Sequence, residues 1–168
     1  MIYVTLGTMF LDFTRLVEKM DQIAAATGEE VMMQIGLSRK TPRHCRSFDF
    51  KPREAVLEIQ RNARVIVAHG GIGAALDALE VRRPLVMVPR LKRFGEHMND
   101  HQIEVAEAME RRGWGRMILN IDELDEACAS PPSVPGTYEP AKAPLIAAVR
   151  AMVTRVAVRK AAGAKVRP

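Results

Sequence analysis

Short apolar runs alternate with amphipathic segments along the chain up to Leu119. The runs have the length of buried strands and are bounded by turn residues. Between them, apolar residues recur every three or four positions, as on one face of a helix. This alternation predicts an α/β fold, namely a Rossmann-like parallel sheet with helices on both faces. The expected strands are Ile2–Leu6, Val31–Ile35, Ser47–Phe50, Val65–Ala68, Leu85–Val88 and Met117–Leu119.

The expected helices begin and end at residues that favour helix termini. They run from about Asp12 to Gly28, from Pro52 to Asn62, from the glycine turn to Arg82, and from Asn99 to about Arg112. Ligands of such sheets bind at the carboxyl ends of the strands. The segments expected at that edge are Gly7-Thr8, the loop after Gly36, His69–Gly73 and Pro89–Gln102.

The glycine-rich turn His69–Gly73 is the segment that most clearly predicts a binding site. It follows a buried strand and opens a helix, so its N–H groups are suited to hold a diphosphate. Asp77 shares a helical face with Gly73 and is suited to accept ribose hydroxyls, whereas Ile72, Ala75, Leu76 and Leu79 form an apolar stripe elsewhere. The spacing differs from the G-x-G-x-x-G dinucleotide turn. A purely structural turn is the alternative.

Composition and charge narrow the class of protein only modestly. A chain of 168 residues with 48% hydrophobic content predicts one globular domain. The net charge of +5 suits an anionic partner without choosing between nucleic acid, lipid headgroups and a sugar nucleotide. Cys45 and Cys128 lack metal-site spacing, which favours buried thiols in a reducing cytoplasm. No apolar run approaches the ~20 residues of a membrane span.

The chain divides into three expected parts. Residues 1–130 form the domain, residues 131–140 form a Pro-rich connector, and residues 141–168 form a basic amphipathic helix and tail. The last part has seven Lys or Arg residues and no acid. It either packs on the domain or contacts an anionic membrane or a partner subunit.

Five motifs in order resemble one known family. They are V-T-L-G-T at Val4–Thr8, F-D-F at Phe48–Phe50, A-H-G-G-I-G at Ala68–Gly73, P-L-V-M-V-P-R at Pro84–Arg90 and G-E-H-M-N-D-H-Q at Gly95–Gln102. From Met1 to Leu119 the chain resembles the C-terminal, donor-binding half of family 28 glycosyltransferases, which have the GT-B fold. It is most similar to the small subunit of bacterial exopolysaccharide and capsule glycosyltransferases, and to the nucleotide-binding subunit of the dolichol-linked N-acetylglucosaminyltransferase.

The resemblance implies a set of donor-binding residues. The glycine turn matches the diphosphate site, Asp77 stands where relatives place a Glu on the ribose, and Gln102 matches a residue that reaches the donor sugar. Ile72 and Ala74 replace hydroxyl residues of many relatives, which shifts phosphate binding towards backbone N–H groups. The implied set is Gly7, Thr8, His69, Gly70, Gly71, Gly73, Asp77, Asp100, His101 and Gln102.

Some of these residues also have structural interpretations. Gln102 is suited to complete a capping box with Asn99 as the N-cap, and His69 is suited to fix the turn by hydrogen bonding to the backbone. His97 and His101 are four residues apart, but without a third ligand a metal site is disfavoured.

The function implied by the resemblance is that of half an enzyme. The chain would be the donor-binding subunit of a two-component inverting hexosyltransferase that uses a UDP-sugar and a lipid-linked acceptor in exopolysaccharide or capsule biosynthesis. No tightly bound cofactor or metal is implied. The catalytic base and the acceptor site would belong to a membrane-associated partner, which recruits the cytoplasmic chain to the inner face of the membrane.

Two other classes of function are considered. One is a non-catalytic nucleotide-sugar-binding or regulatory subunit that stabilises a membrane-bound partner. Nucleic-acid binding through the basic segments is disfavoured, because the chain is only 5% aromatic and offers few stacking surfaces.

Overall fold

A computed structural model describes residues 1–134 of the chain. The expected basic helix at 141–168 and most of the connector at 131–140 lie outside the described residues. Residues 131–134 are irregular. None of the helices within residues 1–134 is long and apolar enough to span a membrane.

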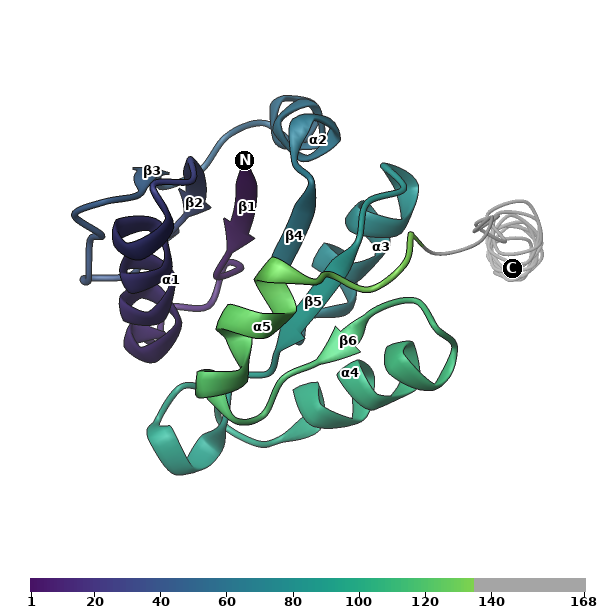
Figure 1. The fold of residues 1–168 in the computed structure, drawn as a ribbon. Coiled ribbons are helices and arrows are strands. Elements are labelled where there is room, and N and C mark those ends of the chain that lie inside the picture. Colours follow the sequence, from purple (N-terminus) through teal and green to yellow (C-terminus); the bar gives the residue numbers. More distant parts are fainter. Residues whose placement is uncertain (135–168) are drawn as a thin grey trace, which may run out of the picture. The chain divides into compact units, whose positions relative to one another are not determined.

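Six parallel strands form one sheet, in the order β3-β2-β1-β4-β5-β6 (Figure 1). Tyr3 in the central strand β1 lies in register with Met32 on β2 and with Ile66 on β4. The parallel α/β prediction is therefore confirmed. The strands are β1 (Ile2–Thr5), β2 (Val31–Gln34), β3 (Arg46–Phe48), β4 (Val65–His69), β5 (Leu85–Val88) and β6 (Arg116–Met117).

The helices agree with the expected order, although two of them begin later than expected. α1 begins at Thr14 rather than near Asp12, and α4 begins at His101 rather than at Asn99. A short helix near the end of the described chain was not predicted, because six residues are too few to show a helical period. The helices are α1 (Thr14–Thr27), α2 (Arg53–Asn62), α3 (Ile72–Glu80), α4 (His101–Arg111) and α5 (Leu124–Ala129), with 3₁₀ turns η1 (Lys92–Phe94) and η2 (Ile121–Glu123).

Helices cover both faces of the sheet, which explains why the central strands β1, β4 and β5 are almost wholly apolar. Ile2 and Val4 belong to a core shared with α1 and α5. Tyr3 and Ile66 are also fully buried but point to the opposite face, because successive strand residues alternate. Both faces of β1 are thus buried, as in other parallel sheets.

The loops that follow the strands meet at the carboxyl edge of the sheet. The β1–α1 loop begins at Leu6, the turn Gly70-Gly71 follows β4, and the longer β5–α4 connection contains η1. Arg90 in this connection donates hydrogen bonds to the carbonyl oxygens of Leu6 and Leu11 in the β1–α1 loop. The prediction that these segments lie together is confirmed.

Candidate functional site

A hollow of about 380 Å³ lies at the carboxyl edge, over the ends of β1, β2 and β4 and beside α2 and α3. It contains half of the ten predicted donor-binding residues, namely Gly7, Thr8, His69, Gly73 and Asp77. Sequence reasoning missed its other polar lining residues, which are Thr5, Gln34, Lys51, Arg53 and Gln60. Lys51 follows the F-D-F motif directly, and Lys51 and Arg53 stand on either side of Pro52, which precedes α2. Two cations at this place in the sequence are a local signal of a segment that faces an anion.

The N-terminus of α3 opens towards this hollow. Gly71 is the N-cap, and no side chain caps the helix. Its first-turn N–H groups and the positive end of its dipole are therefore available to an anion. A Cβ added at Gly73 would meet no atom within 4 Å, so the approach is open. Ile72, the first residue of α3, is 54% exposed, so the expected apolar stripe is wrong at this residue.

Asp77 is held in place with one carboxylate oxygen left free. Its Oδ1 accepts hydrogen bonds from Arg53 Nε at 3.1 Å and Nη2 at 2.5 Å. Arg53 Nη2 also donates to Glu80 at 2.8 Å. Among the described residues nothing donates to Asp77 Oδ2. The carboxylate can therefore accept a ligand hydroxyl without losing Arg53.

His69 packs between two glycine backbones. A Cβ at Gly7 would lie 2.5 Å from the imidazole ring, and one at Gly71 would lie 2.3 Å from Nε2. Gly7 also has a φ of 76°, in the left-handed region. Burial, with the nearby charge of Arg90, lowers the pKa of His69 to about 4. The ring is therefore neutral at pH 7 and acts as a spacer between the two turns.

The predicted residues of α4 lie outside the hollow. Gln102 is 5% exposed, and its Oε1 accepts the backbone N–H of Arg90 at 3.0 Å. The capping-box interpretation of Gln102 is wrong, because the N-cap is Asp100 and Gln102 is the second helical residue. Asp100 accepts the backbone N–H of Lys92 at 2.8 Å, and His101 is exposed beside Asn99.

Gln102 nevertheless lies close to the glycine turn, which is the candidate diphosphate site. A Cβ at Gly70 would lie 2.7 Å from Cβ and from the carbonyl oxygen of Gln102. Gly70 is thus required by this close approach of α4. The structure therefore places Gly70 against Gln102, a contact between residues 32 positions apart that the sequence spacing does not predict.

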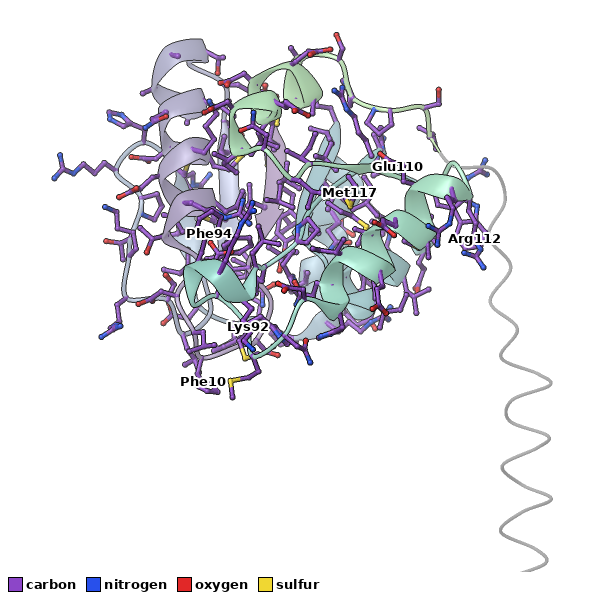
Figure 2. All side chains as sticks on the ribbon, turned by 90° about the horizontal axis from the view of Figure 1, so that it is seen from below. Phe10, Lys92, Phe94, Glu110, Arg112 and Met117 are labelled. Carbon is purple, nitrogen blue, oxygen red and sulfur yellow. The ribbon has the colours of Figure 1, made fainter. Side chains whose placement is uncertain are left out.

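A second hollow of about 770 Å³ lies on the other side of the β1–α1 loop. Its apolar side chains are exposed: Phe10 is 68%, Leu37 is 56% and Phe94 is 55% accessible. Figure 2 shows Phe94 and Lys92 beside the 3₁₀ turn η1, with Phe10 at the lower edge of the view. Such a gathering of exposed large apolar groups is typical of a surface that another molecule covers.

No group of three potential metal ligands occurs within residues 1–134. The rings of His97 and His101 lie 4.6 Å apart at their centroids, in an edge-to-face arrangement. The repulsion between their charged forms contributes, after burial, to a lowered pKa of His97.

Comparison with known proteins gives relatives of much greater length. The chain is 26% identical over 129 residues to an uncharacterized UDP-glucosyltransferase, YojK of Bacillus subtilis, covering 75% of this chain and 30% of the relative. It is 29% identical over 122 residues to the mouse UDP-N-acetylglucosamine transferase subunit ALG13, covering 66% of this chain and 10% of the relative. The chain thus spans a third or less of these proteins.

Comparison with solved structures also gives glycosyltransferases. The crystal structure of the glycotransferase of kitacinnamycin superposes with a TM-score of 0.58 at 24% identity, over 76% of this chain and 34% of the other. The fold is the Rossmann-like fold of the C-terminal half of a GT-B glycosyltransferase. The model of the glycosyltransferase family 28 C-terminal domain matches residues 1–149. The chain is therefore a member of the glycosyltransferase family 28 C-terminal domain family.

Proposed function

We propose that this chain is the donor-binding subunit of a two-component inverting glycosyltransferase, which transfers a hexose from a UDP-sugar to a lipid-linked acceptor in exopolysaccharide or capsule biosynthesis. The observation that carries the proposal is the uncapped N-terminus of α3, which opens on the hollow beside Asp77. A helix N-terminus with free N–H groups is a diphosphate site. A carboxylate one turn further along is suited to bind ribose.

The chemistry follows from this arrangement. The acceptor hydroxyl attacks the anomeric carbon, the bond from that carbon to the diphosphate oxygen breaks, and UDP leaves with the bonding electrons. The N–H groups of α3 and the nearby cation Lys51 stabilise the negative charge that grows on the diphosphate. The proton of the acceptor hydroxyl passes to a base.

In this proposal the base belongs to a partner. His69 has its pKa lowered to about 4 and is wedged between glycines, so it has neither the basicity nor the freedom to take the proton. Asp77 already holds Arg53 at Oδ1 and is assigned to the ribose. No other acidic side chain or imidazole lines the hollow within the described residues.

The second hollow supports the need for a partner. It is lined by the exposed Phe10, Leu37 and Phe94 together with Arg15 and Arg39, and aromatic and Arg residues are enriched in protein–protein interfaces. Asp12 and Glu18 line the same hollow, which disfavours direct contact with anionic lipid headgroups. We infer that a membrane-associated, acceptor-binding subunit covers this surface and recruits the chain to the inner face of the cytoplasmic membrane.

The test is calorimetric titration of the purified chain with uridine diphosphate, with adenosine and guanosine diphosphates as controls. Selective binding of uridine diphosphate supports the donor-binding role. Equal binding of all three nucleotides would reduce the site to a general anion site. No binding, even of a UDP-sugar, would refute the proposal that the chain alone forms the donor site.

A second candidate is a nucleotide-sugar-binding subunit without a catalytic role. It is favoured by the same absence of a free base in the hollow among the described residues. Turnover of a UDP-sugar by the reconstituted complex, lost when Asp77 is replaced by Ala, would exclude it. Selective binding without turnover would support it.

A further inference from the structure

Arg90 is a buried arginine for which packing alone gives no reason. It is 1% exposed and lies two residues after the end of β5. Burial lowers its pKa to about 10, which still leaves the guanidinium charged at pH 7. A buried charge is costly unless its donors are satisfied, and an apolar side chain of similar volume would fill the same space at lower cost.

The Nη1 and Nη2 donors of this guanidinium go to backbone carbonyls of two separate loops, whereas the buried Nε has no partner among the described residues. Nη2 donates to the carbonyl oxygen of Leu6 at 2.8 Å, and Nη1 donates to that of Leu11 at 2.7 Å. Nη1 also lies 3.2 Å from the carbonyl oxygen of Glu96. The guanidinium packs over the ring of Phe13, 4.7 Å from its centroid. Arg90 thus joins the β1–α1 loop to the β5–α4 connection.

An ion pair between Arg15 and Glu96 fixes the same connection to α1. Glu96 is 4% exposed, and its carboxylate accepts from Arg15 Nε at 2.8 Å and from Arg15 Nη2 at 3.1 Å. It also accepts the backbone N–H of Leu91 at 2.9 Å. Arg15 donates to the carbonyl oxygen of Pro89 at 2.6 Å. The residues on either side of Arg90 are therefore anchored to α1.

Both loops carry predicted donor-binding residues. Leu6, which accepts from Arg90, is the residue before Gly7-Thr8, and Gly7 and Thr8 line the candidate hollow. The backbone N–H of Arg90 donates a hydrogen bond to Oε1 of Gln102, and this bond fixes the orientation of the Gln102 amide. Nε2 of that amide donates to none of the described residues.

We propose that Arg90 is a positioning residue, which fixes the Gly7-Thr8 turn and the amide of Gln102 relative to each other so that both are preorganised for the donor sugar nucleotide. This inference rests on the donor-binding function proposed above. Preorganisation matters because a loop that must be ordered on binding loses affinity to the entropy of ordering.

The test compares Arg90→Met in the full chain with the matched variant Arg83→Met. Arg83 also donates to a backbone carbonyl, that of Arg61, but at the opposite end of the sheet. Hydrogen exchange is measured by mass spectrometry, and UDP-glucose affinity by calorimetry. We expect exchange in residues 7–12 and 91–97 to become about tenfold faster in Arg90→Met, with α2 unchanged.

The same variant should bind UDP-glucose about tenfold more weakly, whereas Arg83→Met should stay within about twofold of the wild type. Faster exchange across the whole domain, or unchanged exchange in the two loops, would overturn the positioning role. If Arg90→Met does not fold, Arg90→Lys carries the same comparison, since it keeps the charge with fewer donors. Failure of both variants to fold would show a general structural role and overturn the inference.

The exchange result is independent of the proposed function. If the wild-type chain bound no UDP-glucose, the donor-binding function would fail, and local exchange would still decide whether Arg90 holds the two loops. If the wild type bound UDP-glucose and Arg90→Met bound it equally well, only the positioning inference would fail.

Discussion

Replacing Asp77 by Ala tests the ribose assignment most directly. Asp77 lines the hollow with Oδ2 free of donors among the described residues, while Oδ1 is occupied by Arg53. A hydrogen bond to a charged acceptor contributes about 1.5–3 kcal/mol. Since the side chain is 24% exposed, the lower half of that range applies. The variant should therefore bind uridine diphosphate about 10-fold to 40-fold more weakly.

The fold should be nearly unaffected by the same change. The ion pair with Arg53 is partly exposed, at 52% and 24%, and such pairs contribute little to stability. Ala is also a better helix former than Asp, which offsets part of the loss within α3. The melting temperature should stay within about 2 °C of the wild type. A large drop in melting temperature would show that the ion pair with Arg53 matters more than this reasoning allows.

The assay is calorimetric titration, with Glu80→Ala as the matched control. Glu80 shares Arg53 with Asp77 but does not line the hollow, so its removal should leave the affinity within about twofold. On the ligand side, 2′,3′-dideoxyuridine diphosphate should bind the wild type and Asp77→Ala equally. If Asp77→Ala lost affinity for the dideoxy nucleotide as well, or lost none for uridine diphosphate, the ribose assignment would be refuted.

Three further predictions concern the glycine turn and its neighbours. Gly71→Ala places a Cβ 2.3 Å from the His69 ring and should lower the free energy of unfolding by about 1–3 kcal/mol. Gly73→Ala has open space around its Cβ, so it should keep or raise stability but weaken the binding of uridine diphosphate. Urea denaturation measures the two stabilities and calorimetry the affinity, and equal losses of stability would contradict the geometry. Because the pKa of His69 is about 4 when folded and about 6.5 when unfolded, the unfolded chain binds more protons in this range, so stability should fall by up to about 3 kcal/mol from pH 6.5 to 4. His69→Gln should reduce that fall, leaving the shares of His97 and of Asp12, Asp21 and Glu29, whose pKa values are lowered by their hydrogen-bond partners. An unchanged slope in urea melts would count against a neutral His69. Gln102→Leu leaves a buried backbone N–H without its acceptor and should cost about 1–3 kcal/mol in urea denaturation, and a neutral effect would show that the N–H finds another partner.

Local patterns were sufficient to predict the framework of this protein. The central strands β1, β4 and β5 are almost wholly apolar because both faces of the sheet are covered, and Gly28 ends α1 in the left-handed conformation that glycine favours. Each of these features depends on residues close together in the chain. The turn after β4 was predicted for the same reason, since strand, glycines and helix follow one another directly.

The role of Gln102 shows where local reasoning fails. Asn99 has the side chain of a good N-cap, and the residue three positions later is a Gln, so the capping box was a reasonable prediction. In the structure, burial against Gly70 and the bond from the Arg90 N–H decide the orientation of Gln102 instead. A tertiary contact across 12 residues overrides the preference of the helix terminus.

The sequence by itself thus determined the order of the elements, the parallel sheet and the position of the glycine turn. The tertiary structure alone decided which side chains share the site. Arg53 meets Asp77 across 24 residues, and Arg90 meets the carbonyl of Leu6 across 84. The physical reason is that a helix or a turn is stabilised by neighbours in the chain, whereas a buried charge needs acceptors that only the folded chain brings together.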